Sequence, residues 1–198
     1  MNIGVLALQG AVAEHIQMLC ALGVKAIPIR LPSQLDSLDG LVIPGGESTT
    51  ISKLLYEYDL MEPLRLLATK GFPLFGTCAG MILLASKTTD LRWQPVGAID
   101  IEVQRNAFGR QIDSFEADLE IPALGDKPFR GIFIRAPIVG RVNSSVDILC
   151  RLNGSVVATK QGKAIACAFH PELTDDSRFH KYFLDLVTGE PIAQGSSR

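Results

Sequence analysis

The chain has little of what would direct a protein to nucleic acid, to a membrane or to secretion. Its 19 Lys and Arg are outnumbered by 21 Asp and Glu, and the formal net charge is -2. That balance supplies no basic field of the kind that phosphate backbones or anionic lipids require. The first apolar run, residues 3–8, is too short for a signal peptide or a membrane span. We therefore expect a cytoplasmic protein that binds neither nucleic acid nor membrane.

Cysteine is scarce too, with four residues in a chain of 198. Four cysteines fall well short of a disulfide scaffold, and none has a Cys or His partner at metal-ligand spacing, so we expect no metal site. Hydrophobic residues make up 47% of the chain and charged residues 20%, which leaves ample apolar material for one core. We expect a single domain over residues 1–188 and a disordered tail at residues 189–198.

Apolar runs and helical stretches alternate in the first half of the chain. The runs lie at residues 3–8, 26–31, 40–44 and 73–78. They are apolar at nearly every position, as in parallel strands that helices cover on both faces. Helices are predicted at residues 11–22, 49–58, 61–70, 79–86 and 176–187.

Strand patterns follow one another between residues 98 and 169, with a hairpin turn predicted at Gln161 and Gly162. These strands are expected to be antiparallel additions to the sheet of the first half. The sequence thus predicts a three-layer α/β fold of the flavodoxin-like type. Its doubly wound sheet would be mostly parallel, with added antiparallel strands.

The sharpest chemical signal is the sequence Gly-Thr-Cys-Ala-Gly at residues 76–80, where an apolar strand runs into an apolar helix. This pattern is typical of a nucleophile elbow with Cys78 as the nucleophile, because only glycine fits at Gly76 and Gly80 beside so sharp a turn. A helix N-terminus also favours the reactive thiolate. The alternative is a buried cysteine at an ordinary strand–helix junction.

A second signal is His170-Pro171-Glu172, which directly follows an apolar strand. Pro171 disfavours helical backbone at His170, so we expect an extended segment in which His170 and Glu172 face the same side. A carboxylate beside an imidazole fixes its tautomer and stabilises the imidazolium. Alone, the pattern is weak, because a histidine at a strand end is often just a satisfied polar residue.

A third signal is the strand end at residues 42–50, which carries Gly45 and Gly46 and then opens a helix. Consecutive glycines let the backbone turn an N–H toward a bound oxygen, as an oxyanion hole requires. Ser48 is the expected N-cap of the helix. The spacing and lysine of a P-loop are missing, and a plain structural turn is the remaining alternative.

Five segments together resemble one family, the glutaminase subunits of pyridoxal 5′-phosphate synthases, within the class I glutamine amidotransferases. They lie at residues 7–12, 44–50, 76–80, 133–137 and 169–174. The elbow and the His-Pro-Glu sequence are general to class I glutaminases. The other three segments narrow the resemblance to this family, and none departs from its pattern.

The resemblance implies a glutaminase that hydrolyses L-glutamine without a cofactor and passes ammonia to a synthase partner in a hetero-oligomeric complex. Cys78, His170 and Glu172 would form the catalytic triad. The N–H groups of Gly46 and Ala79 would bind the oxyanion. The implied glutamine-binding residues are Gly46, Glu47, Ser48, Arg105, Ile134 and Arg135.

Arg105 and Arg135 are unusual on their own account. Arg105 follows the strand pattern of residues 99–104, and Arg135 interrupts the apolar run of residues 131–138, where a charge needs a partner. A guanidinium matches the α-carboxylate of glutamine in shape and charge. A surface salt bridge explains either arginine equally well.

The other candidates are weaker. Cys20, Cys150 and Cys167 lie in apolar runs without an elbow and are expected to be buried structural thiols. His15 and His180 lie on predicted helix surfaces and are expected to be solvated. Residues 9–10, Gln-Gly, end the first strand, and the resemblance suggests that they relay contact with the synthase to the oxyanion loop.

Two rival interpretations remain, the first also a class I glutaminase and the second a protein of another class. One is a glutaminase that serves another pathway, for instance imidazole-glycerol-phosphate synthesis, against which residues 45–50 and 133–137 argue. The other is a binding or stress-response module on the same fold without activity. Selective labelling of Cys78 by a glutamine-derived electrophile would separate the enzyme from the module.

Overall fold

The computed structural model describes residues 1–89, 92–105 and 114–189. Five strands form a parallel sheet in the order β2-β1-β3-β4-β12. They are β1 (Asn2–Leu6), β2 (Lys25–Ile29), β3 (Gly40–Ile43), β4 (Leu74–Thr77) and β12 (Ala164–Cys167). Four of the five come from the first half of the chain, and the predicted doubly wound parallel sheet is confirmed.

The sheet continues past β12 through strands of mixed direction. They are β11 (Ser155–Gln161), β9 (Ile138–Val142), β6 (Ile99–Gln104) and β5 (Ala85–Thr88), and β10 (Asp147–Leu152) pairs with β11. All of these pairings are antiparallel except that of β5 with β6. A separate antiparallel pair consists of β7 (Ser114–Leu119) and β8 (Phe129–Ile134). The added antiparallel strands are thus confirmed, and the turn between β11 and β12 falls one residue later than predicted, at Gly162 and Lys163.

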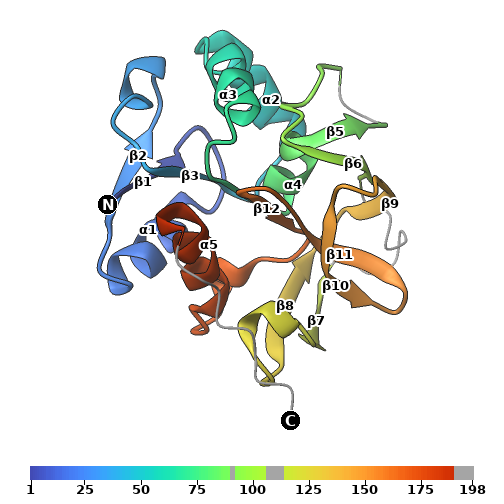
Figure 1. The fold of residues 1–198 in the computed structure, drawn as a ribbon. Helices are drawn as coiled ribbons and strands as arrows, with labels where there is room; N and C mark the ends of the chain where they lie inside the picture. The colour runs from blue at the N-terminus through green and yellow to red at the C-terminus, as the bar shows by residue number, and fades with distance from the viewer. Residues whose placement is uncertain (90–91, 106–113, 190–198) are drawn as a thin grey trace.

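Helices cover both faces of the parallel sheet, which makes three layers (Figure 1). They are α1 (Val12–Ala21), α2 (Ser48–Glu57), α3 (Met61–Thr69), α4 (Ala79–Leu84) and α5 (Arg178–Thr188). The helices α2, α3 and α4 lie on one face, and α1 and α5 lie on the other. Within the described residues, none of these helices is long and apolar enough to cross a membrane.

Two predicted helix ends are wrong. The helix predicted at residues 79–86 stops at Leu84, because Ala85 adopts extended backbone and Ser86 joins β5, where its hydroxyl donates to the Ile101 carbonyl. The helix predicted from residue 176 begins at Arg178. Asp176 stays outside it because its carboxylate accepts the Arg178 N–H at 3.1 Å, a local bond that competes with helix.

The structure corrects one of the three structural cysteines. Cys150 and Cys167 are buried as predicted, and burial raises the pKa of Cys150 to about 11 and that of Cys167 well above its usual value. Cys20 is exposed. The core side of α1 is occupied by His15 and Leu19, one helical turn apart, and Cys20 lies off that face.

His15 and His180 are not solvated, contrary to the prediction; both are fully buried. They pack edge-on against Phe75 of β4, with ring centroids 6.0 and 5.4 Å away. Burial lowers the pKa of His180 to about 3. Burial first, and then the neighbouring His180 and His170, lower the pKa of His15 well below 6.5. Both rings are therefore neutral at pH 7.

The burial of two neutral histidines predicts that the folded protein loses stability in acid. Below pH 6.5 the unfolded chain binds protons at both histidines and the folded chain does not, so each costs about 1.4 kcal/mol per pH unit in unfolding free energy. Urea unfolding at pH 7, 6 and 5 should show a steeper acid decline for wild type than for His180→Phe, which keeps a ring in place. Parallel declines would contradict the assignment.

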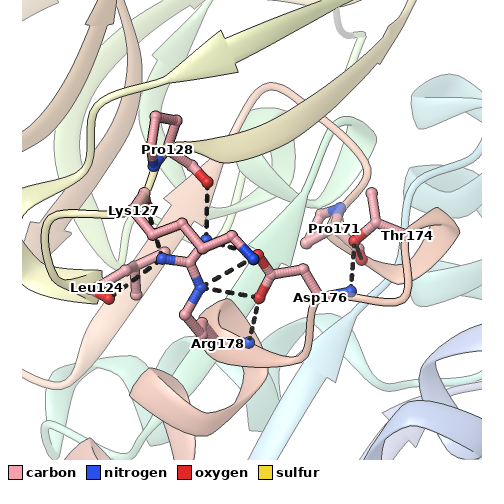
Figure 2. Close-up of polar contacts among 7 residues, drawn as sticks. All are labelled: Leu124, Lys127, Pro128, Pro171, Thr174, Asp176 and Arg178. Atoms are coloured by element: carbon pink, nitrogen blue, oxygen red, sulfur yellow. Dashed lines mark hydrogen bonds and ion pairs between the residues drawn. The ribbon is translucent and has the colours of Figure 1, made fainter.

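A clasp around Arg178 fixes the start of α5 (Figure 2). Its guanidinium binds the Asp176 carboxylate at 2.6 and 3.0 Å and donates to the carbonyls of Lys127 and Pro128 at 2.6 and 2.8 Å. The pKa of Asp176 is lowered because these hydrogen bonds outweigh its burial. The clasp joins α5 to the segment before β8, and Asp176 in turn donates its N–H to Thr174.

Arg178→Ala should therefore destabilise the protein by roughly 2–3 kcal/mol, because three acceptors lose a charged donor together. Lys181→Ala is the matched control on the same helix, since it removes the ion pair of an exposed lysine with Asp185 and should cost less than about 1 kcal/mol. Denaturant unfolding of both variants measures the difference. Equal losses would show that the clasp contributes no more than a surface pair.

Candidate active site

Cys78 lies on the turn between β4 and α4. Its backbone conformation, with φ 49° and ψ -101°, is one that residues other than glycine rarely adopt. The flanking glycines are required by backbone contacts: a Cβ at Gly76 would lie 2.5 Å from Gly80, and one at Gly80 would lie 2.0 Å from the Ile43 carbonyl. Such backbone strain costs about 1–3 kcal/mol and clusters at functional sites. The turn holds Cys78 at the carboxyl edge of the sheet and at the N-terminus of a helix.

His170 and Glu172 meet beside this turn, although not through an extended segment. The sequence predicted extended backbone after His170, but Pro171–Leu173 forms a turn of 3-10 helix, because Pro171 is well suited to a first helical position. Within that turn, His170 Nδ1 lies 2.7 Å from Glu172 Oε1. The His170 N–H donates to the Ile132 carbonyl at 2.8 Å, which anchors the segment to β8.

The imidazole of His170 favours the protonated form. Its burial lowers the pKa, but hydrogen bonds with Cys78 and Glu172 outweigh burial and raise the pKa to about 10. At neutral pH the ring is therefore an imidazolium between a sulfur and a carboxylate. In this state it can hold a thiolate and later give up a proton.

The glycine loop is held by neighbouring strand ends. The Gly45 N–H donates to Thr77 Oγ1 at 2.9 Å, and the Gly45 carbonyl accepts from the Ala11 N–H at 3.1 Å. Gly10 has φ 107° and leaves no room for a side chain, since a Cβ there would lie 1.9 Å from the Gly45 oxygen. Neither Gly45 nor Gly46 has a positive φ. The described residues offer the N–H groups of Gly46 and Ala79 no hydrogen-bond acceptor.

Glu47, and not Ser48, caps helix α2. Its carboxylate accepts from the N–H groups of Thr49 and Thr50 at 3.0 and 2.6 Å. Burial raises the pKa of Glu47, but these hydrogen bonds outweigh it and lower the pKa to about 2. Ser48 is the first helical residue and is buried. Glu47 occupies the N-cap position because its longer side chain reaches two N–H groups at once.

The two arginines differ in their surroundings. Arg105 contacts the N-terminal end of α2 at two points. Its Nη2 lies 3.0 Å from Glu47 Oε1, and its Nη1 lies 2.9 Å from Thr49 Oγ1. A salt bridge, one of the two explanations from the sequence, is therefore present. Arg135 lies just beyond β8 with φ 43° and is exposed, so it does not interrupt a buried strand.

These segments enclose a pocket of about 300 Å³. It is lined by Gln9, Gly10, Ala11, Gly45, Gly46, Glu47, Ser48, Cys78, Ala79, Ile82, Arg105, Ile134, Arg135 and His170. Every candidate from the sequence lines it except Glu172, which lies behind His170. Cys78 Sγ is 3.7 Å from the Ile134 carbonyl. No cluster of His, Cys, Asp and Glu that could hold a metal occurs in residues 1–89, 92–105 and 114–189.

Sequence reasoning missed two polar residues beneath the pocket. Thr77 Oγ1 receives the Gly45 N–H, and His15 Nε2 lies 3.4 Å from Glu172 Oε2. A polar residue at the end of an apolar strand was a signal for Thr77. His15 gave no sequence signal, because its neighbour lies on a segment more than 150 residues away.

Comparison with known proteins identifies the family of the chain. The family model described as the SNO glutamine amidotransferase family matches residues 5–188. The pyridoxal 5′-phosphate synthase subunit PdxT of Carboxydothermus hydrogenoformans is 54% identical, over 94% of this chain and 98% of its own. The subunit of the same name from Herpetosiphon aurantiacus is 55% identical, over 94% of this chain and all of its own.

A solved structure extends the likeness to three dimensions. The crystal structure of a glutamine amidotransferase superposes with a TM-score of 0.89 at 46% identity, over 94% of this chain and 98% of that one. The match confirms the predicted fold class. The chain belongs to the SNO glutamine amidotransferase family.

Proposed function

We propose that the protein is the glutaminase subunit of a pyridoxal 5′-phosphate synthase, which hydrolyses L-glutamine to L-glutamate and ammonia. The observation that carries the proposal is the position of Cys78, on a strained turn at a helix N-terminus, beside the imidazolium of His170. The buried carboxylate of Glu172 supports that ring from behind. The relatives named as PdxT extend the proposal to this pathway.

Glutamine is proposed to bind with its carboxamide at Cys78 and its amino-acid end toward Arg105 and Arg135. A guanidinium suits an α-carboxylate, and the pocket is lined by both arginines. Glu47, which keeps its negative charge because its pKa is about 2, suits the substrate ammonium. Gly46, Ser48 and Ile134 supply the remaining contacts.

The reaction follows from the order of groups around the pocket. The Cys78 thiolate attacks the carboxamide carbon, and the N–H groups of Gly46 and Ala79 stabilise the oxyanion. His170 gives its proton to the departing nitrogen, which leaves ammonia and a glutamyl thioester. A water then loses a proton to His170 and attacks the thioester, which releases glutamate and restores the Cys78 thiolate beside the imidazolium. Glu172 keeps the ring oriented throughout.

Ammonia is proposed to pass to a separate synthase chain in a hetero-oligomeric complex. Both relatives carry a subunit name, which implies such a partner for them. No cofactor is needed for the hydrolysis itself. We place the protein in the cytoplasm, and its four free cysteines support that assignment.

Cys78→Ser should lose more than about nine-tenths of the glutaminase rate while keeping the fold, because a hydroxyl is a far weaker nucleophile at this site. Glutamate release in the presence of a pyridoxal 5′-phosphate synthase subunit is the measurement. Cys20→Ser, Cys150→Ser and Cys167→Ser are controls, which should keep turnover whatever their effect on stability. A Cys78→Ser rate above about a tenth of wild type would contradict the triad.

The free protein should be a poor glutaminase that the synthase activates through the Gly45–Gly46 peptide. One lost oxyanion donor costs about 3 kcal/mol of barrier, so the orientation of this peptide can gate turnover. A side chain of the neighbouring strand end contacts the loop, since Gln9 Oε1 accepts the Glu47 N–H at 2.7 Å. Partner contact at Gln9 and Gly10 can therefore reach the oxyanion loop.

Gly46→Ala tests this gating for a reason that the sequence did not supply. The residue has no positive φ, but its new methyl group would lie 2.4 Å from Gln9 Oε1. We expect the synthase-stimulated rate to fall more than the basal rate. Gly140→Ala, whose methyl group meets nothing closer than 3.3 Å, is the matched control. Wild-type rates that are equal with and without synthase would overturn the gating and leave the triad intact.

A further inference from the structure

The second oxygen of the Glu172 carboxylate has one polar neighbour that the proposed mechanism does not use. Oε1 lies 2.7 Å from His170 Nδ1, whereas Oε2 is buried, accepts no hydrogen bond from the described residues and lies 3.4 Å from His15 Nε2. A buried carboxylate oxygen without a donor carries a large desolvation cost. The position of His15 therefore decides whether this oxygen is satisfied.

His15 lies at the centre of a buried polar group below the active site. Its Nδ1 is 2.8 Å from His180 Nε2, which joins α1 to α5, and its Nε2 is 3.2 Å from Thr77 Oγ1. These helices lie beside each other on one face of the sheet (Figure 1). The ring thus has a partner on each nitrogen, and with Glu172 its polar neighbours come from three other segments of the chain.

The contacts favour one pair of tautomers for His15 and His180. His180 Nδ1 is buried without a partner among the described residues, and an orphan acceptor is tolerated better than an orphan N–H. His180 Nε2–H then donates to His15 Nδ1, and His15 Nε2–H faces Thr77 Oγ1 at 3.2 Å and Glu172 Oε2 at 3.4 Å. The opposite tautomers would bury an unpaired N–H at His180 and turn a lone pair of His15 toward the carboxylate.

A neutral donor suits this position. The charged groups facing the His15 ring are Glu172 and, further away, His170, while His180 is neutral. A protonated His15 would neutralise Glu172 and weaken its hold on the His170 imidazolium. A neutral N–H orients the carboxylate and leaves its charge for His170.

The same ring also reaches the glycine loop. Thr77 Oγ1, 3.2 Å from His15 Nε2, accepts the Gly45 N–H at 2.9 Å. One side chain therefore lies between the carboxylate of the triad and the loop that carries the oxyanion donor. Movement of His15 would disturb both parts of the site.

We propose that His15 is a positioning residue for catalysis: its Nε2–H faces the Glu172 carboxylate and stabilises its charge, and His180 fixes the tautomer that makes this possible. The inference rests on the proposed glutaminase activity and extends it to a pair of histidines that do not touch substrate. Neither residue lines the pocket. Changes at either should therefore act on kcat and leave the KM for glutamine unchanged.

Two isosteric substitutions separate positioning from mere packing. His15→Gln places an amide N–H where Nε2 lies and keeps the contact with Glu172, whereas His15→Asn places its amide at Nδ1 and loses that contact. In the complex with the synthase, we expect His15→Gln to keep kcat within about threefold and His15→Asn to lose about tenfold, because only the first keeps a donor beside the Glu172 carboxylate. KM should stay the same in both.

His180→Phe adds an independent test of the tautomer. It keeps a ring against Phe75 but removes the donor to His15 Nδ1, so we expect kcat to fall several-fold at unchanged KM. Phe183→Leu, which alters packing on the same Phe75 without touching the hydrogen bonds, is the control for lost stability and should keep kcat.

The outcomes are distinct. Equal kcat for the Gln and Asn variants, or a loss in Phe183→Leu that matches the loss in His15→Asn at equal folded fraction, would overturn the positioning role. If His15→Asn does not fold, an unchanged kcat in His180→Phe overturns it instead. A wild-type complex without glutaminase activity would contradict the proposed function itself and not this inference alone.

Discussion

The close approach of backbones at the Cys78 turn is the constraint on which the rest of the site depends. Neither Gly76 nor Gly80 has room for a Cβ, because β4, α4 and the end of β3 touch there through backbone atoms. The strands β3, β4 and β12 are parallel neighbours, so their carboxyl ends lie at one edge of the sheet beside this contact. The glycine loop, Cys78 and His170 each follow one of these strands, so the pocket forms where the three ends meet.

Charge is arranged in layers away from the pocket. An imidazolium, whose pKa burial would lower but hydrogen bonds with Cys78 and Glu172 raise, lies nearest the sulfur. A carboxylate lies behind it, and two neutral histidines lie behind the carboxylate. Each group supports the charge of the one in front of it. The neutral histidines leave the carboxylate its negative charge, and that charge stabilises the imidazolium. Most of this arrangement is buried, which strengthens each interaction.

The parallel sheet and the grouping of residues around Cys78 could be predicted from the sequence, because strand periodicity and glycine spacing are local properties. Prediction from the sequence failed where partners are distant in the chain or where side chains compete for one position. His15 read as a surface residue because its partner, His180, lies 165 positions away. Ser48 read as the helix cap because propensity alone does not show that Glu47 reaches two N–H groups. The helical turn at Pro171 was missed because the rule for the residue before proline says nothing of those after it.

The most direct test of the account is to trap the covalent intermediate. The complex with the synthase would be mixed with glutamine, quenched in acid within one turnover and digested for mass spectrometry. The account predicts a glutamyl group on the peptide that contains Cys78 and on none that contains Cys20, Cys150 or Cys167. Glutamate release with no adduct on Cys78, or with an adduct on another cysteine, would contradict it.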